Sequence, residues 1–194
     1  PYVGLENLTT ARNKAHHVGV WVDGQFSWVN SEDWQKDINV HDDALVSDIT
    51  MTNTTLKVGL HFQDFVDCNN DIFARRVRVR NLDSRKRQIR VFFHQIFHIS
   101  AMGRADTAMY VPVDNYILDY KGRCSILAYA ETESGVTFDQ YAVGSAGIEG
   151  KEGTFRDAED GELSMSAVEH AGVDSTLRVV LDVEAGSSEV IHYW

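Results

Sequence analysis

Cysteine, proline and long apolar runs are all scarce in this chain of 194 residues. Cys68 and Cys124 are the two cysteines, and they do not form a Cys-x-x-Cys pair. One disulfide between them is possible, but two free, packed thiols are the prediction. No apolar run approaches the ~18 residues of a membrane-spanning helix. We therefore expect no membrane partner. We also expect the protein to be cytoplasmic.

Positive charge is also in short supply, since 18 lysines and arginines stand against 29 aspartates and glutamates and give a net charge of −11. A nucleic-acid partner is not expected, because phosphate binding needs a positive surface. The basic run at residues 75–80, with 85–87, is a local exception. It could form an anion or RNA patch, but the alternation of a strand explains its spacing and favours a solvated face balanced by acids.

Catalytic and metal-binding motifs are missing as well. The sequence has no Gly-x-Ser-x-Gly, no P-loop and no Gly-x-Gly-x-x-Gly, so nucleophilic, phosphoryl-transfer and dinucleotide chemistry have no support. His94 and His98 would lie about 13 Å apart along a strand. Two ligands of one zinc ion lie within about 4 Å of each other, so this pair predicts no metal site. We expect no metal and no cofactor.

An acidic run follows in a glycine-rich part of the chain. Its members are Asp157, Glu159, Asp160 and Glu162. The run lacks the ligand spacing of an EF-hand calcium loop. It predicts either a solvated acidic turn or a set of carboxylates that pairs with the arginines between Arg75 and Arg90.

Short segments with alternating apolar residues are what the sequence has in quantity. They lie at residues 16–22, 25–29, 34–40, 45–51, 56–62, 73–80, 87–99, 116–120, 123–130, 136–142, 177–183 and 190–194. Asp23-Gly24 predicts a type I′ hairpin turn between the first two. Residues 143–175 break the pattern, and a loop of that length is usually functional or a binding surface. The pattern predicts one all-β domain, an antiparallel sandwich.

The segment 87–100 is predicted to be the central strand of the fold. Its first half alternates apolar and polar residues, whereas Phe92, His94, Ile96 and His98 make the second half of the polar face apolar as well. We therefore expect that half to be covered by another domain, a loop or a ligand.

The preceding strand is predicted to form a hairpin with this segment through residues 82–86. Val79 would then lie opposite Ile89, and Arg78 opposite Arg90. The like-charge pair requires acidic partners from elsewhere in the chain.

A series of short motifs carries a resemblance to a known family. They are Pro1-Tyr-Val-Gly-Leu-Glu-Asn7, Val18-Gly-Val-Trp-Val-Asp-Gly24, Arg75-Arg-Val-Arg-Val-Arg-Asn81, Phe92-Phe-His94, Phe97-His-Ile-Ser100, Asp106-Thr-Ala108, Tyr120-Lys-Gly-Arg123, Asp139-Gln-Tyr141 and Gly153-Thr-Phe-Arg-Asp-Ala-Glu-Asp-Gly-Glu-Leu163. In this order they resemble the amino-terminal domain of bacterial and archaeal glycoside hydrolase family 15 enzymes, the glucoamylase, glucodextranase and trehalase-type proteins.

The resemblance implies an all-β, antiparallel two-sheet supersandwich, similar to the galactose mutarotase fold and incomplete at its N-terminus. It also implies that residues 1–194 form one domain of a larger glycosidase, with an (α/α)6 catalytic barrel downstream. The family inverts the anomeric configuration with two glutamates. No residue of this chain matches that catalytic motif, so the resemblance assigns no catalytic residue here.

Two functional hypotheses follow. In the first, the chain is a non-catalytic domain of an exo-acting α-glucoside hydrolase for α-1,4-glucan, dextran or trehalose, and it packs on its own C-terminal catalytic domain. The candidate contacts with that domain or its active-site rim are Phe92, His94, Ile96, His98, Asp106 and Tyr110. In the second, it is an independent carbohydrate-binding module in which Trp21, Trp28 or Trp34 stacks on glucan, although large aromatics beside a hairpin are more often core.

Overall fold

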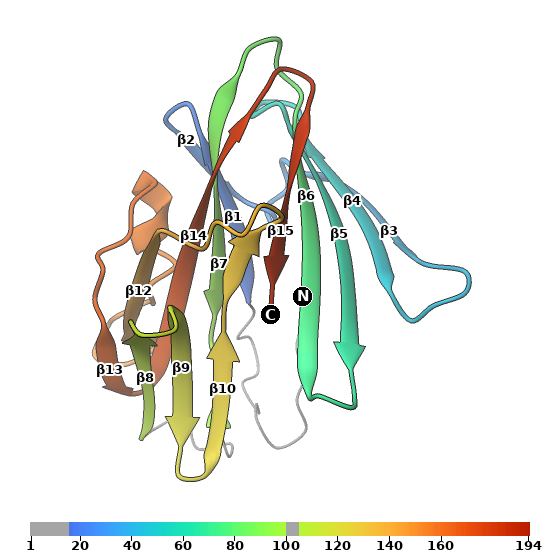
Figure 1. The fold of residues 1–194 in the computed structure, drawn as a ribbon. Helices are drawn as coiled ribbons and strands as arrows, with labels where there is room; N and C mark the ends of the chain where they lie inside the picture. Colours follow the sequence, from blue (N-terminus) through green and yellow to red (C-terminus); the bar gives the residue numbers. More distant parts are fainter. Residues whose placement is uncertain (1–15, 100–104) are drawn as a thin grey trace.

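The computed structural model describes residues 16–99 and 105–194, whose regular secondary structure is almost entirely antiparallel strands (Figure 1). The elements are β1 (His17–Val22), β2 (Gln25–Trp28), β3 (Gln35–Val40), β4 (Ser47–Asn53), β5 (Val58–Asp67), β6 (Ile72–Asn81), β7 (Arg87–Gln95), β8 (Asp106–Val111), β9 (Tyr116–Lys121), β10 (Cys124–Ala128), β11 (Ala130–Thr132), β12 (Gln140–Ser145), the 3-10 helix η2 (Asp157–Asp160), β13 (Val168–Ala171), β14 (Val173–Val183) and β15 (Ser188–Tyr193). The predicted all-β antiparallel class is confirmed.

The strands form three sheets. Sheet A has the order β12-β14-β7-β1-β2, sheet B the order β11-β15-β6-β5-β4-β3, and sheet C the order β10-β9-β8-β13. One core cluster takes buried residues from all three, for example Val91 of sheet A, Val77 of sheet B and Ile117 of sheet C. In Figure 1, β10 runs on into β11, so sheets C and B lie side by side across the core from sheet A.

The hairpin predicted at Asp23-Gly24 is present. The two residues have φ values of 53° and 80°, the positive values that a type I′ turn requires at both central positions. β1 and β2 pair in register on either side of the turn, with Val22 opposite Gln25.

The predicted hairpin between the strands around Val79 and Ile89 is wrong. β6 pairs with β5 and β15 in sheet B, and β7 pairs with β1 and β14 in sheet A. Arg78 therefore does not face Arg90, which lies opposite Trp21 and Val180. The apolar sides of the two strands do share one environment, but they meet across the core rather than beside each other within one sheet.

Side-chain hydrogen bonds hold the connection between β6 and β7, where the chain passes from sheet B to sheet A. The Asn81 side-chain amide donates to the backbone oxygens of Arg85 and Val183, at 2.8 and 3.0 Å. The buried Arg87 guanidinium donates to the backbone oxygens of Leu56 and Lys57, at 2.8 and 2.6 Å. These bonds fix the chain at the point where it leaves one sheet for the other.

Candidate functional site: the covered face of sheet A

The long irregular segment after β12 covers the outer face of sheet A. Residues 153–163, here called the strap, include η2 and are orange in Figure 1, beside β12 and β13. Ala158 and Leu163 of the strap pack against Phe92 and Ala142, in a cluster separate from the main core. The predicted cover over the second half of β7 is therefore present, and it is a loop of the chain itself.

Two glycines let the strap approach the sheet. Gly161 has φ +92°, and a Cβ atom there would lie 2.6 Å from Nε1 of Trp21. Gly153 has φ +139°, and its Cβ would lie 2.6 Å from a carboxylate oxygen of Asp174. An L side chain meets both a strained backbone and a clash at each position, so only glycine fits without rearrangement.

Two arginines of the sheet hold the C-terminal end of the strap. Arg90 and Arg178 each donate to the backbone oxygen of Gly161 at 2.9 Å. Each also donates to one oxygen of the Glu162 carboxylate, at 2.6 and 2.7 Å. A hydrogen bond from Gln140 and the charge of Arg178 lower the pKa of Glu162 below its usual value. Of the acidic run, Glu162 thus pairs with Arg90, which bears out the predicted pairing with the arginines between Arg75 and Arg90 for this one residue.

Two other basic residues of the predicted cluster pair with acids outside the strap. Arg75 is buried and forms two hydrogen bonds with the Asp64 carboxylate of β5, at 2.8 and 2.6 Å. Arg85 reaches Asp23 at 2.7 Å. The basic run is therefore divided between buried and exposed positions, with acids beside Arg75 and Arg85 and with Arg78 and Arg80 exposed on β6.

The N-terminal end of the strap is held by a buried polar group. His94 Nε2 lies 2.9 Å from Oδ2 of Asp174, so it donates to that carboxylate. The same oxygen accepts the backbone N–H of Thr154 at 2.6 Å and its hydroxyl at 3.0 Å. The histidine and the carboxylate resemble part of a catalytic triad, but all three residues are buried and the hydroxyl bonds to the acid. The group anchors the strap and offers no nucleophile to a substrate.

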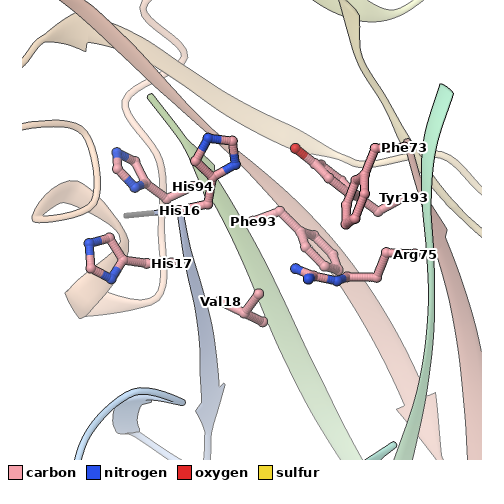
Figure 2. A pocket seen from close by; sticks show the side chains of 8 residues that line it. All are labelled: His16, His17, Val18, Phe73, Arg75, Phe93, His94 and Tyr193. Carbon is pink, nitrogen blue, oxygen red and sulfur yellow. The ribbon is translucent and has the colours of Figure 1, made fainter. Parts of the chain in front are cut away.

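Three histidines gather beside this anchor. Figure 2 shows His16, His17 and His94 around a cavity of about 10 Å³, with Val18, Phe73, Arg75, Phe93 and Tyr193 as the other lining residues. The space admits about one water molecule and no sugar ring. Burial and the nearby His94 lower the pKa of His16 to about 3 and that of His17 to about 4. Both rings are therefore neutral at physiological pH.

A second buried polar group lies on the inner face of sheet C. Asp106 is 0% exposed and pairs with Lys121, whose Nζ lies 3.2 Å from Oδ1. Burial and the charge of Asp106 raise the pKa of Asp119 to about 7. The two carboxyl groups face the core and not a cleft, so they are not accessible to a glycoside.

The larger hollow of the surface has a volume of about 430 Å³ and lies between β12 and the segment before the strap. The carboxylates that line this hollow already have hydrogen-bond or ion-pair partners. Glu152 pairs with Arg156 at 2.7 Å, Glu169 lies 3.9 Å from Lys151, and Asp157 accepts the Ser164 backbone N–H at 2.6 Å. Among residues 16–99 and 105–194, no group of three His, Cys, Asp or Glu residues could hold a metal ion.

The six predicted contact residues are not on an open surface. Phe92, His94, Ile96 and Asp106 are buried, and His98 and Tyr110 are half-buried. Tyr110 stacks on Tyr141 with ring centroids 3.8 Å apart and donates to Asn115. Because the strap covers Phe92 and His94, these two side chains contact the chain's own loop, and the role of the six residues as contacts with a further domain stays a prediction.

The three tryptophans do not form a sugar-stacking platform. Trp34 is 4% exposed and its indole N–H donates to Ser27 inside the core. The guanidinium carbon of Arg90 lies over the Trp21 ring, 4.2 Å from the ring centroid. The indole N–H of Trp28 donates to Glu159 of the strap at 3.1 Å. Trp34 is therefore a core residue, as large aromatics beside a hairpin usually are. Trp21 and Trp28 contact the strap instead.

Sequence reasoning missed two residues that matter most here, Arg178 and Asp174. Both lie on the outer side of β14, whose inner side carries Leu177 and Val179. Arg178 also makes two bonds to Asp139, at 3.0 and 2.5 Å. The signal for Arg178 was a charged residue between the apolar Leu177 and Val179, which requires a partner of opposite charge when it is buried. Asp174 is followed by Ser175 and Thr176 and gave no such signal.

Both cysteines are free, as predicted, but Cys68 is exposed and Cys124 half-buried, so the expectation that both are packed is wrong for Cys68. The described ranges contain no helix long and apolar enough to cross a membrane.

Comparison with known proteins gives information on the fold. No protein-family model matches the sequence, and no curated protein sequence matches it. The solved structure of a bacterial glucoamylase complexed with acarbose matches with a TM-score of 0.63 and 10% sequence identity. The likeness is one of fold. It covers 92% of this chain and 26% of that chain, so this chain spans about a quarter of the length of the glucoamylase.

Proposed function

We propose that this chain is a non-catalytic β-sandwich domain of a larger, glucoamylase-like glycoside hydrolase. One observation carries the proposal: the fold of nearly the whole chain, 92%, matches a part that makes up only 26% of a glucoamylase. A domain of such an enzyme would give this relation. The motifs that resemble the amino-terminal domain of glycoside hydrolase family 15 run through the same residues.

The geometry supports a supporting role rather than a catalytic one. An inverting glycosidase needs two carboxyl groups ~6.5–9.5 Å apart on either side of an accessible glycosidic bond. In the part of the chain that the structure describes, the buried carboxyl groups Asp106, Asp119 and Asp174 face the core or hold the strap. The exposed ones of the larger hollow are in ion pairs or bonded to backbone.

In this proposal the complete enzyme is cytoplasmic and acts in carbohydrate metabolism. It removes glucose from the end of an α-1,4-glucan, from dextran or from trehalose with inversion, in a catalytic domain outside residues 1–194. The sandwich packs on that domain and stabilises it.

Glucose release tests the proposal. The full-length protein and residues 1–194 alone are assayed on maltose, dextran and trehalose, after circular dichroism shows that the short chain is folded. We expect glucose from the full-length protein on at least one substrate and none from the short chain. Glucose from the short chain, or no hydrolysis of any α-glucoside by the full-length protein, would contradict the proposal.

A further inference from the structure

The outer face of sheet C carries an apolar row that crosses all four of its strands. Val168 of β13 lies opposite Met109 of β8, Met109 opposite Leu118 of β9, and Leu118 opposite Leu127 of β10. The opposite face of the sheet packs into the core through Ala108, among others. Because strand side chains alternate, the row of four points away from the core.

The rest of this face is free of acidic and basic side chains other than one histidine. The remaining positions are Thr107, Val111, Tyr116, Tyr120, Ser125 and His170. In this chain 24% of the residues are charged. A sheet face without Lys, Arg, Asp or Glu is therefore unusual for a surface of this protein, and it has the composition of the centre of a protein interface.

The row is open at both ends. Val168 is 63% exposed and Leu127 is 52% exposed, while Met109 and Leu118 between them are half-buried by their neighbours. Sheet A differs, because the strap covers its outer face. Within residues 16–99 and 105–194 no segment covers sheet C in that way, and β8, β9 and β10 lie at the front of the molecule in Figure 1. Contiguous exposed apolar patches commonly mark interaction surfaces.

We propose that the outer face of sheet C is the surface on which the rest of this protein's own polypeptide packs. This inference rests on the proposed function, because it takes its partner from there. The matched glucoamylase is about four times as long as the part that this chain resembles, so a protein built in the same way has a further domain in the same polypeptide. Such a partner is present at a high effective concentration, which a modest apolar interface needs.

The chemistry of the face favours a protein partner over a sugar. Tyr116 and Tyr120 are the aromatic residues on this side of β9, about 13 Å apart at ~3.3 Å per residue. The branched side chain of Leu118 lies between them, so the rings do not form a continuous stacking platform. Aliphatic side chains occupy the centre, where a partner's apolar side chains can be buried.

Hydroxyl-radical footprinting tests the surface directly. Met109 and Tyr120 are oxidised in the full-length protein and in residues 1–194 alone, and the modified fraction is compared by mass spectrometry. We expect several-fold slower oxidation of both residues in the full-length protein. The exposed Met165 (45%) lies outside sheet C and is the internal reference. Equal rates for Met109 and Tyr120 in the two proteins would overturn the proposal.

A pair of substitutions tests the same surface by association. Leu127→Lys with Val168→Lys places two charges at exposed positions of the row, and Val136→Lys, at 60% exposure outside sheet C, is the matched control. After protease cleavage between the domains, the two parts of the wild-type and control proteins should co-elute in size-exclusion chromatography. The parts of the double variant should separate. Co-elution in the double variant would contradict the assignment.

These outcomes are distinguishable from those of the proposed function. Hydrolysis of an α-glucoside with no protection of Met109 leaves the proposed function in place and removes this surface. If residues 1–194 alone form a dimer that the double substitution dissociates, a second copy is the occupant and the intramolecular partner is wrong.

Discussion

At the scale of single residues, the strap depends on positions where one atom decides the fit. The sequence alone predicts the turn at Asp23-Gly24, because its conformation is set by its immediate neighbours. It does not predict the need for glycine at Gly161, since the clash there comes from Trp21, 140 positions away in the sequence. Local turn chemistry can thus be read from a sequence, whereas tertiary close approach cannot.

Gly161→Ala should lower the free energy of unfolding by about 2 kcal/mol, because the positive φ is strained for alanine and the added methyl group meets the Trp21 ring. Gly135→Ala is the control, since it has φ +81° and no atom within 4 Å of the added Cβ. It should cost about 1 kcal/mol, the backbone strain alone. Urea denaturation measures both. Equal losses would mean that the contact with Trp21 is not tight.

Asp119→Asn should stabilise the protein at alkaline pH. The pKa of Asp119 is raised to about 7, so its ionisation costs folding free energy that increases as the pH rises from about 4 to 7 and then stays constant. The asparagine variant does not ionise, and its advantage should be at least about 1 kcal/mol larger at pH 8 than at pH 5. Asp182→Asn, at an exposed position of β14, is the control and should show no such trend. A pH-independent difference for Asp119→Asn would contradict the raised pKa.

At the scale of elements, the sequence predicts the strands and the presence of a cover but not their partners. Ile89 and Val91 find apolar neighbours equally well in β1, in β14 or in the predicted hairpin partner β6. Alternation fixes which side of a strand is apolar, but it does not distinguish pairing within a sheet from packing across a core. A loop was one of the possible covers, but two anchors of the strap, Arg178 and Asp174, were not predicted, because alternation does not show which strand lies beneath a loop.

Glu162→Ala should loosen the strap, because it leaves Arg90 and Arg178 without the carboxylate that they share. Arg178 is 6% exposed and keeps its bonds to Asp139, so the loss of one buried hydrogen bond to a charged group should cost about 1–3 kcal/mol. Limited proteolysis should cut faster within residues 153–163. Glu152→Ala removes an exposed ion pair with Arg156 and should change the cleavage rate little. Unchanged proteolysis of the Glu162 variant would mean that Gly161 and the apolar contacts suffice.

At the scale of the whole molecule, the buried histidines set the response to acid. His16 and His17 are neutral in the folded protein because burial lowers the pKa of each, to about 3 and about 4, whereas the unfolded chain binds their protons below about 6.5. Their contribution to stability is therefore complete above pH 6.5 and decreases as the pH falls towards 4.

His16→Gln should flatten this decrease. The variant binds one proton fewer when it unfolds. This reduces the slope of the unfolding free energy against pH by up to about 1.4 kcal/mol per pH unit between pH 6 and 4. His17 contributes less, because burial lowers its pKa less far, to about 4 instead of about 3. His41→Gln, at an exposed site, is the control and should keep the wild-type slope. Urea denaturation at several pH values gives the slopes, and identical slopes for His16→Gln and wild type would contradict the prediction.

The position of the strap has a practical consequence for spectroscopy. Of the four tryptophans, Trp21 and Trp28 lie beneath the strap, Trp34 is in the core and Trp194 is at the end of β15, 39% exposed. Release of the strap would remove the close approach of Gly161 from Trp21 and the Glu159 carboxylate from Trp28 without disturbing the core ring. A red shift in emission that precedes the loss of far-ultraviolet circular dichroism would therefore report this local opening, with no added dye.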